Sequence, residues 1–499
     1  MDIAFDNDKY LKLQSENILK RVSQFSGKLY LEFGGKLFDD YHASRVLPGF
    51  LPDSKLRMLL TIKERVEVVI VINAIDIQNN KLRGDLNITY EKDVLRLIDA
   101  FKAAGLYVGS VCITRFQRTP QVQSFRKKLT NLGIKSYVSY DIEGYPHNVS
   151  KIISDEGFGK NEYIETEREI VVVTAPGPGS GKMATCLSQL YHENKRGIKA
   201  GYAKYETFPI WSIPLKDPVN LAYEAATADL ADVNMIDPYH LEAYGKIAIN
   251  YNRDVESYPV LKSMFEAIYG YSPYKSPTDM GVNMAGFAIC NSDVSAKASK
   301  DEIIRRYLNT IVLYRNGKAT QEAIDKIALL MQAVNVSVDD RPSVQYSLEK
   351  QKKTNTPSMA ITLDDGVTLT SKTSPLLSAP AALILNALKH LASISDDVLL
   401  ISPEIIEPIS RLKIQDLGNH NPRLHADEVL IALAICAKDD EVAARALSKI
   451  SELKHTQAHS TVILPESDER VFKKLGIDLT TEPESYAQKL YRKVENLEN

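Results

Sequence analysis

The stretch EIVVVTAPGPGSGKMATCLSQL, residues 169–190, decides the fold of this chain. Its opening EIVVVT is apolar and β-branched after the glutamate, which is typical of a buried strand. Gly177, Gly179 and Gly181 follow at alternate positions, and the segment from about Lys182 to Asn194 predicts a helix. A buried strand, a glycine-rich turn and a helix in this order are typical of an α/β protein with a parallel sheet.

Strand and helix patterns alternate on both sides of this element. The run VEVVIVINAI, residues 66–75, is too continuously apolar for a half-exposed strand and predicts a central strand covered on both faces. We therefore expect an α/β fold with a doubly wound, mainly parallel sheet that includes the strand–turn–helix element. Further strands are predicted at 28–33, 106–114, 134–140 and 198–205, and helices at 91–104 and 120–132.

The later part of the chain predicts two further segments. Residues 232–280 are rich in Tyr, Pro and Asn and predict an irregular or mixed insertion, and the polar segment 338–357 predicts a domain boundary. Asp-Asp-Gly at 364–366 predicts a hairpin beyond it. The expected domains are an α/β domain at 1–230, a mixed, helical insertion at 231–337 and a smaller C-terminal α/β subdomain at 338–499. Helices are predicted at 217–230, 300–314, 320–334, 379–394, 426–437 and 440–453, and strands near 398–402 and 460–464.

Composition excludes several functional classes. Among 499 residues, 61 Lys and Arg against 64 Asp and Glu give a net charge of −3, so no global nucleic-acid or membrane footprint is expected. The longest apolar run, Val429–Ala437, is far shorter than the roughly 20 residues that span a bilayer. The opening MDIAFDNDKY lacks the pattern of a secretory signal, and the four cysteines are widely separated. We expect a cytoplasmic protein.

The segment from Gly177 to Lys182 has the chemistry of a phosphate-binding loop. Glycines allow backbone N–H groups to converge on an anion, and the N-terminus of the following helix adds unpaired donors and partial positive charge. Lys182 would place a full charge beside the terminal phosphates. A purely structural strand-to-helix turn is the alternative interpretation. The predicted phosphate-binding residues are Gly177, Gly179, Ser180, Gly181, Lys182 and Thr185.

Two positions depart from the P-loop pattern G-x-x-x-x-G-K-[ST]. Pro176 stands where the first glycine is required, and Met183 replaces the hydroxyl residue that normally binds Mg²⁺. The predicted cofactor is ATP or GTP with Mg²⁺, but the missing hydroxyl weakens the case for metal-dependent chemistry more than the case for phosphate binding.

Carboxylates for phosphoryl transfer would come from positions near the ends of strands. Glu206 follows the strand 198–205 and Asp217 lies a short way beyond it, so the predicted catalytic residues are Lys182, Glu206 and Asp217. Asp217 also fits a helix cap. Asp76 ends the most apolar strand, where a Mg²⁺-binding aspartate or a turn residue would stand, and the sequence favours the turn residue.

The histidines give no metal motif. His455 and His459 have the i, i+4 spacing of a helical zinc site, but the glutamate of the zinc-protease motif is missing and strand signals begin at Ser460. His425 in the segment HADE differs by one position from the H-x-E of zinc deaminases. We therefore predict no protein-bound metal site.

Three segments together resemble a known family. They are APGPGSGKMAT (175–185), KYETFPIW (204–211) and LKDPVNLAYEAATADL (215–230). With these segments, the chain resembles over its whole length the bacterial family described as domain of unknown function 1846, also called uncharacterised protein family 0371. The resemblance implies a cytoplasmic bacterial protein with an α/β region and smaller C-terminal subdomains, and it implies no particular activity.

The leading hypothesis is an enzyme, a phosphotransferase or NTPase, that binds a nucleotide or another phosphorylated metabolite at the glycine turn. The alternative is a non-catalytic protein that holds a phosphometabolite for regulation or assembly. In both cases the expected partner is a phosphorylated small molecule, with no nucleic acid or membrane. The size of the chain and its aromatic-rich segment are also compatible with a homo-oligomer.

Overall fold

The computed structural model describes residues 2–35, 37–38, 40–83, 86 and 88–485. Two compact units make up this part of the chain. One comprises Asp2–Glu224 and Asp232–Ala296, and the other comprises Ala225–Ala231 and the described part of Lys297–Asn499. Whether 1–230, 231–337 and 338–499 fold as separate domains stays a prediction that limited proteolysis would check.

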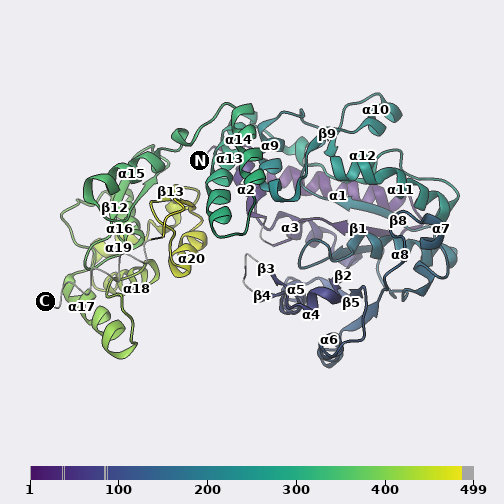
Figure 1. The fold of residues 1–499 in the computed structure, drawn as a ribbon, viewed down its shortest axis with the longest axis horizontal. Coiled ribbons are helices and arrows are strands. Elements are labelled where there is room, and N and C mark those ends of the chain that lie inside the picture. Colours follow the sequence, from purple (N-terminus) through teal and green to yellow (C-terminus); the bar gives the residue numbers. More distant parts are fainter. Residues whose placement is uncertain (1, 36, 39, 84–85, 87, 486–499) are drawn as a thin grey trace. The chain divides into compact units, whose positions relative to one another are not determined.

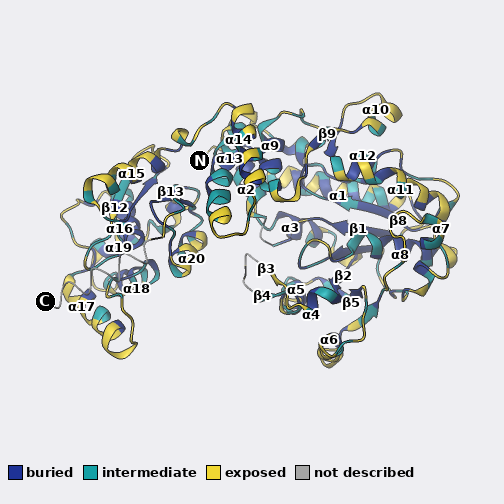
Figure 2. Ribbon diagram, in the orientation of Figure 1, coloured by how far each residue is buried: buried dark blue, intermediate teal, exposed yellow. Residues whose placement is uncertain are grey.

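A six-stranded sheet is the centre of the first unit (Figure 1). Its strand order is β6-β5-β2-β7-β1-β8, and every neighbouring pair is parallel, which confirms the expected parallel α/β sheet. All residues of β1, β2 and β7 are buried, which is why their sequences read as continuous apolar runs (Figure 2). The strands are β1 (Leu29–Phe33), β2 (Val66–Asn73), β5 (Tyr107–Thr114), β6 (Lys135–Val138), β7 (Ile170–Thr174) and β8 (Gly201–Tyr205).

Helices cover both faces of this sheet. Alternate residues of the strands, among them Val69, Val171 and Tyr202, form one core with residues of α8 and α11. The buried face of α5 lies outside that core and packs on β2 and β5. The helices of this part of the chain are α1 (Asn7–Ser23), α2 (Tyr41–Val46), α3 (Ser54–Thr61), α4 (Ala74–Gln78), α5 (Tyr90–Ala103), α6 (Pro120–Asn131), α7 (Val149–Ile152), α8 (Lys182–Lys195), α9 (Pro218–Ala226), α10 (Pro238–Tyr244), α11 (Asn252–Tyr269) and α12 (Pro277–Met280).

The segment 232–280, expected to be irregular or mixed, is mixed: it contains two short strands and the helices α10, α11 and α12. There α11 runs for 18 residues with Pro259 inside it, and proline is the residue that argued against a helix in the sequence. Asp254, Tyr258 and Phe265 are among the residues that α11 buries, so tertiary packing stabilises this helix despite the missing N–H. Two short antiparallel pairs complete the first unit: β3 (Leu82–Arg83) with β4 (Ile88–Thr89), and β9 (Asn234–Ile236) with β10 (Ile249–Tyr251).

The second unit has a smaller mixed sheet of order β12-β11-β13-β14. The hairpin predicted around Gly366 is confirmed, since β11 and β12 are antiparallel and Gly366 has a φ of 82°. β13 and β14 are parallel. The strands are β11 (Ser358–Thr362), β12 (Thr368–Lys372), β13 (Gln457–Ser460) and β14 (Asp478–Thr481). The helices are α13 (Ser292–Arg315), whose residues from Lys297 onward belong to this unit, α14 (Gln321–Ala333), α15 (Pro342–Thr354), α16 (Ala379–Leu391), α17 (Pro403–Arg411), α18 (Ala426–Cys436), α19 (Glu441–Leu447) and α20 (Glu466–Leu475).

Two sequence expectations in this unit are corrected. The segment 398–402 is not a strand, and the strand expected at 460–464 lies at 457–460. The polar segment 338–357 is mostly the helix α15, which buries only Ser343, Val344 and Ser347. Because two of these three buried residues are serines, the helix has no apolar stripe that the sequence could reveal.

Candidate functional site

The glycine turn 175–181 lies where the strand connections of the sheet reverse direction. From β1 the chain passes through α2 and α3 to β2, and from β7 it passes through α8 to β8. In the sheet β7 lies between β1 and β2, and β1 lies between β7 and β8. The chain thus leaves the adjacent strands β1 and β7 in opposite directions. Open α/β sheets bind ligands beside the carboxyl ends of strands at such a point.

Hydrogen bonds hold the carbonyl side of the turn. The Ser180 hydroxyl donates to the Gly177 carbonyl at 2.9 Å. The Thr114 hydroxyl, at the end of β5, donates to the Ser180 carbonyl at 2.7 Å. The N–H and the hydroxyl of Thr185 both donate to the Gly181 carbonyl at 2.9 Å. These bonds orient the peptide planes of the turn, so its shape is set by the protein itself.

The N–H side of the turn is different. Within the described ranges, no residue accepts a hydrogen bond from the N–H of Gly177, Gly179 or Gly181. Gly179 and Gly181 have φ values of 74° and 90°, which glycine adopts without strain. No side chain of the described part of the chain caps α8, so the N–H groups of Lys182, Met183 and Ala184 have no acceptor there either. The Lys182 ammonium makes no ion pair or hydrogen bond with a described residue. Unpaired donors, a helix N-terminus and a free lysine together suit an anion.

The side chains of Ser180 and Thr185 shape the turn from inside. They are 1 % and 3 % exposed, and both hydroxyls are used on carbonyls of the turn. Gly177 is required by a close approach, since a Cβ there would lie within 3.0 Å of atoms of the Tyr90 ring. The backbone and Lys182 are therefore the parts of the predicted phosphate site that the structure leaves available.

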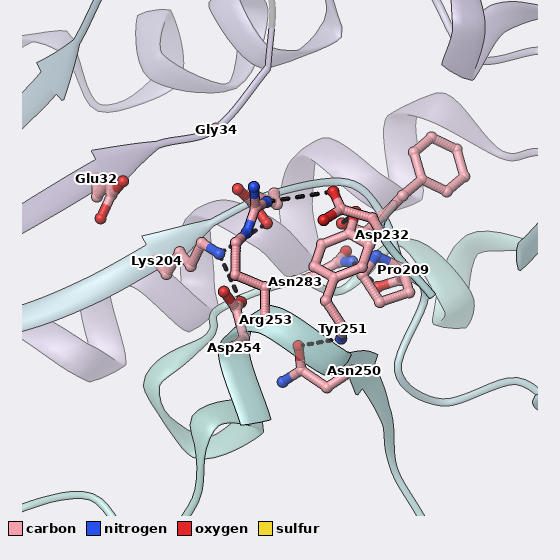
Figure 3. A network of polar contacts seen from close by, with 12 residues as sticks. Glu32, Gly34, Lys204, Pro209, Asp232, Asn250, Tyr251, Arg253, Asp254 and Asn283 are labelled. Carbon is pink, nitrogen blue, oxygen red and sulfur yellow. Dashed lines mark hydrogen bonds and ion pairs between the residues drawn. The ribbon is translucent and has the colours of Figure 1, made fainter. Parts of the chain in front are cut away.

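A second group of polar side chains lies at the same edge of the sheet (Figure 3). We call Glu32, Lys204, Glu206 and Asp254 the Lys204 cluster. Lys204, near the end of β8, lies 2.5 Å from Asp254 Oδ2 and 3.1 Å from Glu206 Oε2. Glu32 accepts a hydrogen bond of 2.6 Å from the Tyr202 hydroxyl. One lysine thus stands among three carboxylates, and Figure 3 shows its side chain pointing toward Asp254 at the start of α11.

Glu206 reaches from β8 across the end of β1. A Cβ on Gly34 would lie under 3.0 Å from the Cγ, Cδ and Oε1 atoms of Glu206, so the carboxylate occupies the space that a side chain at 34 would take. Since β1 separates β8 from β7 in the sheet, Glu206 leans toward the strand that carries the glycine turn. Glu206, one of the predicted catalytic residues, thus lies at the carboxyl ends of the strands.

Burial and charge shift the pKa values in this cluster. Burial raises the pKa of Glu206; the Lys204 charge opposes this, while Asp254 and Glu32 add to it. Burial alone would lower the pKa of Lys204, but Asp254 and Glu206 outweigh it and hold the pKa above its usual value. Lys204 therefore stays charged, and the proton affinity of the Glu206 carboxylate is raised.

The buried thiol of Cys186 lies in α8, within the core between this helix and the sheet. Burial raises the pKa of Cys186, the Glu32 carboxylate raises it further, and the Lys182 ammonium opposes them. Tyr30 belongs to the core that α8 and α11 form on one face of the sheet, and Glu32, two residues further along β1, points to that same face. The glycine turn and the Lys204 cluster together form the candidate site.

Asp217 has a structural role in the described chain. Its Oδ1 accepts a hydrogen bond of 2.9 Å from the Val219 N–H, so it caps α9. No hydrogen bond or ion pair joins Asp217 to the turn or to the Lys204 cluster in the part of the chain that the structure describes. Sequence reasoning missed Glu32, Lys204 and Asp254; the signal for the first two was a charged residue within an otherwise buried strand.

The residues that the structure describes contain neither a cluster of metal-binding side chains nor a membrane-spanning helix. No three His, Cys, Asp or Glu side chains there come together as a metal site, and no helix is long and apolar enough to cross a membrane. His459 lies in β13 and contacts the Thr480 hydroxyl at 2.8 Å, so it shares no helix face with His455. A surface hollow in the second unit contains none of the predicted site residues; it is lined by Glu404, Glu407, Pro408, Ser410, Arg411, Ile414, Gln415 and Pro422.

Fold and site define an α/β protein with a six-stranded parallel sheet and a glycine turn that leads into an uncapped helix. Residues 3–335 match the family model "Domain of unknown function DUF1846, N-terminal", and residues 339–491 match "Domain of unknown function DUF1846, C-terminal". The chain belongs to this family, as the resemblance in the sequence implied.

The relatives are similar over nearly their full length. A UPF0371 protein of Streptococcus pyogenes serotype M5 is 55 % identical over 491 residues, which cover 98 % of this chain and 99 % of the relative. A UPF0371 protein of Streptococcus thermophilus is 54 % identical over 490 residues, with the same coverage. Among solved structures, the ADP form of the Aeropyrum pernix ORC2 protein aligns with a TM-score of 0.16 and 10 % identity, over 86 % of this chain and 84 % of that chain. A TM-score this low supports no conclusion about a shared fold or function.

Proposed function

We propose that this protein binds a phosphorylated small molecule, a nucleotide or a phosphorylated metabolite, at the turn 177–182. One observation carries the proposal: hydrogen bonds hold the carbonyl groups of the turn, while the N–H groups of Gly177, Gly179 and Gly181 have no acceptor among the described residues. Such a turn presents donors at fixed positions, so it binds an anion without first reorganising. Lys182 adds the full charge that a terminal phosphate requires.

The Lys204 cluster favours an enzyme over a simple binding protein. Glu206, with its raised pKa, is the group we propose as proton acceptor for an attacking hydroxyl or water. Asp217, predicted with Glu206 to support metal or substrate, caps α9, and we give it no part in this proposal. The alternative, a non-catalytic phosphometabolite-binding or assembly protein, is favoured by Met183, which offers no hydroxyl for the metal of an NTPase.

Thermal unfolding of the full chain with ATP, GTP and sugar phosphates, with and without Mg²⁺, tests the proposal. A ligand at about 100 times its dissociation constant should add roughly 2.7 kcal/mol of stability. Lys182→Ala should lose most of this gain. Lys195→Ala, at the other end of α8 and about 20 Å away along its axis, is the control and should keep it.

The outcomes separate the two functions. Stabilisation with turnover, lost in Glu206→Gln while binding persists, supports a phosphotransferase or NTPase. Stabilisation without turnover supports the binding protein. A wild-type protein that no phosphorylated compound stabilises, or a Lys182→Ala variant with every shift intact, contradicts the proposed site.

A further inference from the structure

The Asp76 carboxylate is buried with one oxygen unused. Asp76 is 9 % exposed, and its Oδ2 has no hydrogen-bond partner among the described residues. Its Oδ1 lies 3.3 Å from the ammonium of Lys81. Buried carboxylate oxygens are almost always satisfied by a donor, a water or a cation, because water is no longer there to solvate them. Oδ2 therefore lacks a partner that its chemistry requires.

Asp76 stands beside the glycine turn. β2 is the neighbour of β7, and Ile70 pairs with Thr174, so β2 continues three residues further past this level, to Asn73. The short helix α4 then carries Asp76 at the level of the turn. The Asn73 amide donates to the Gly179 carbonyl at 3.5 Å, which joins this strand end to the turn directly.

The neighbours of Asp76 complete the connection on the same side of the turn. The Lys81 ammonium lies 5.0 Å from the centre of the Tyr90 ring, and the Tyr90 hydroxyl lies against Gly177. The Tyr90 ring thus contacts the turn, and Lys81 connects that ring to Asp76, on the β2 side of β7; β1 lies on the other side of β7.

We propose that Asp76 Oδ2 binds a divalent cation, Mg²⁺ by its oxygen chemistry, that accompanies the phosphates held at the turn 177–182; this rests on the proposed function. Mg²⁺ at phosphate sites is bound by one or two carboxylates, the phosphate oxygens and waters. A single carboxylate therefore suffices, which agrees with the finding that no three ligand side chains come together in the described chain. Asp76 would supply the oxygen that Met183 cannot.

The Lys204 cluster is a poorer place for the cation. Asp254 and Glu206 are paired with the Lys204 ammonium, and Glu32 accepts a hydrogen bond from a tyrosine hydroxyl. A cation there would have to displace the buried Lys204 ammonium, whereas the lysine beside Asp76, Lys81, pairs with Oδ1 and has a side chain that is 44 % exposed, so it can turn into solvent. The cation is therefore assigned to the β2 side of the turn.

Isothermal titration of the full chain with inorganic pyrophosphate, in EDTA and in excess Mg²⁺, tests the assignment. Wild type should bind pyrophosphate at least about tenfold more tightly with Mg²⁺, and Asp76→Asn should keep the EDTA affinity but lose that gain. Asp99→Asn removes the same charge from an exposed position on α5, about 14 Å along the helix axis from Tyr90, and should behave as wild type.

Each other outcome overturns the inference in a recognisable way. A Mg²⁺ gain that persists in Asp76→Asn, or that is absent in wild type, rejects the cation site and leaves the proposed function standing. An Asp76→Asn variant that is folded by circular dichroism but loses binding in EDTA as well shows that Asp76 acts on the anion or the turn. If wild type binds pyrophosphate in neither buffer, the proposed function fails and this inference fails with it.

Discussion

Because Gly34 lies close to Glu206, we expect Gly34→Ala to destabilise the wild-type protein but not a variant in which Glu206 is shortened. In Gly34→Ala the new Cβ would lie under 3.0 Å from three atoms of Glu206. Overpacking of this kind costs about 1–3 kcal/mol. The backbone of Gly34 is not in the left-handed region, so alanine can adopt its conformation. Alanine also lowers the conformational entropy of the unfolded chain, which stabilises the folded protein by about 0.4–1 kcal/mol. We expect a net loss of about 1 kcal/mol, the small difference of these two effects.

The same substitution should be harmless once Glu206 is shortened. The three atoms nearest to the added methyl group all belong to Glu206, and Glu206→Ala removes them. In the Glu206→Ala background, Gly34→Ala should therefore be neutral or stabilise by up to about 1 kcal/mol. The coupling energy between the two positions should equal the overpacking cost, about 1–3 kcal/mol.

Urea unfolding followed by tryptophan fluorescence measures this double-mutant cycle. The chain has one tryptophan, Trp211, which lies in the same unit and donates a hydrogen bond of 2.7 Å to the Asn283 carbonyl, so its signal reports on the unit that holds the site. Equal destabilisation by Gly34→Ala in both backgrounds would refute the reasoning, because the cost would then arise from something other than contact with Glu206.

Two further predictions concern buried charge. Lys204→Met should destabilise the first unit by about 3–5 kcal/mol, because it leaves the Asp254 and Glu206 carboxylates without their cation; a change below about 1 kcal/mol in urea unfolding would show that the cluster rearranges freely. In the second unit, the Asp468 carboxylate, 2.9 Å from His425 Nδ1, raises the pKa of His425 above its usual value. The pair therefore stabilises the fold fully below about pH 6.5 and less as the pH rises through the higher folded pKa, so Asp468→Asn should lose most stability in acid, and a melting-temperature difference that is the same at about pH 5.5 and pH 8.5 would contradict this.

Local sequence patterns predicted the strand–turn–helix element well. The expected strand 169–174 is β7 at 170–174, and the helix expected from Lys182 begins at that residue. Both signals are local, because an apolar run is buried in any fold and a cluster of glycines ends a strand whatever surrounds it. The same reasoning did not locate the individual helices α11 and α15, where proline and serine occupy positions that only tertiary packing makes favourable.

The residues of the candidate site also differ in whether the sequence alone could predict their roles. The candidate turn from Gly177 to Lys182 could be proposed from the chain alone, because its residues are consecutive. Asp217 could not be told from a helix cap, because both roles need a carboxylate at that position, and the structure shows the cap. For Asp76 the sequence favoured a turn residue, and its burial with an unused oxygen became visible only in the fold.

The amino-acid sequence by itself determined the parallel α/β sheet, the glycine turn and the family, because burial of apolar runs and the conformational freedom of glycine act over a few neighbouring residues. Tertiary structure alone decided which side chains meet at the turn. Thr114 holds the Ser180 carbonyl from another strand, and Lys204 meets Asp254 across 50 residues of chain. Such contacts depend on strand order and helix placement, which long-range packing sets and no local pattern encodes.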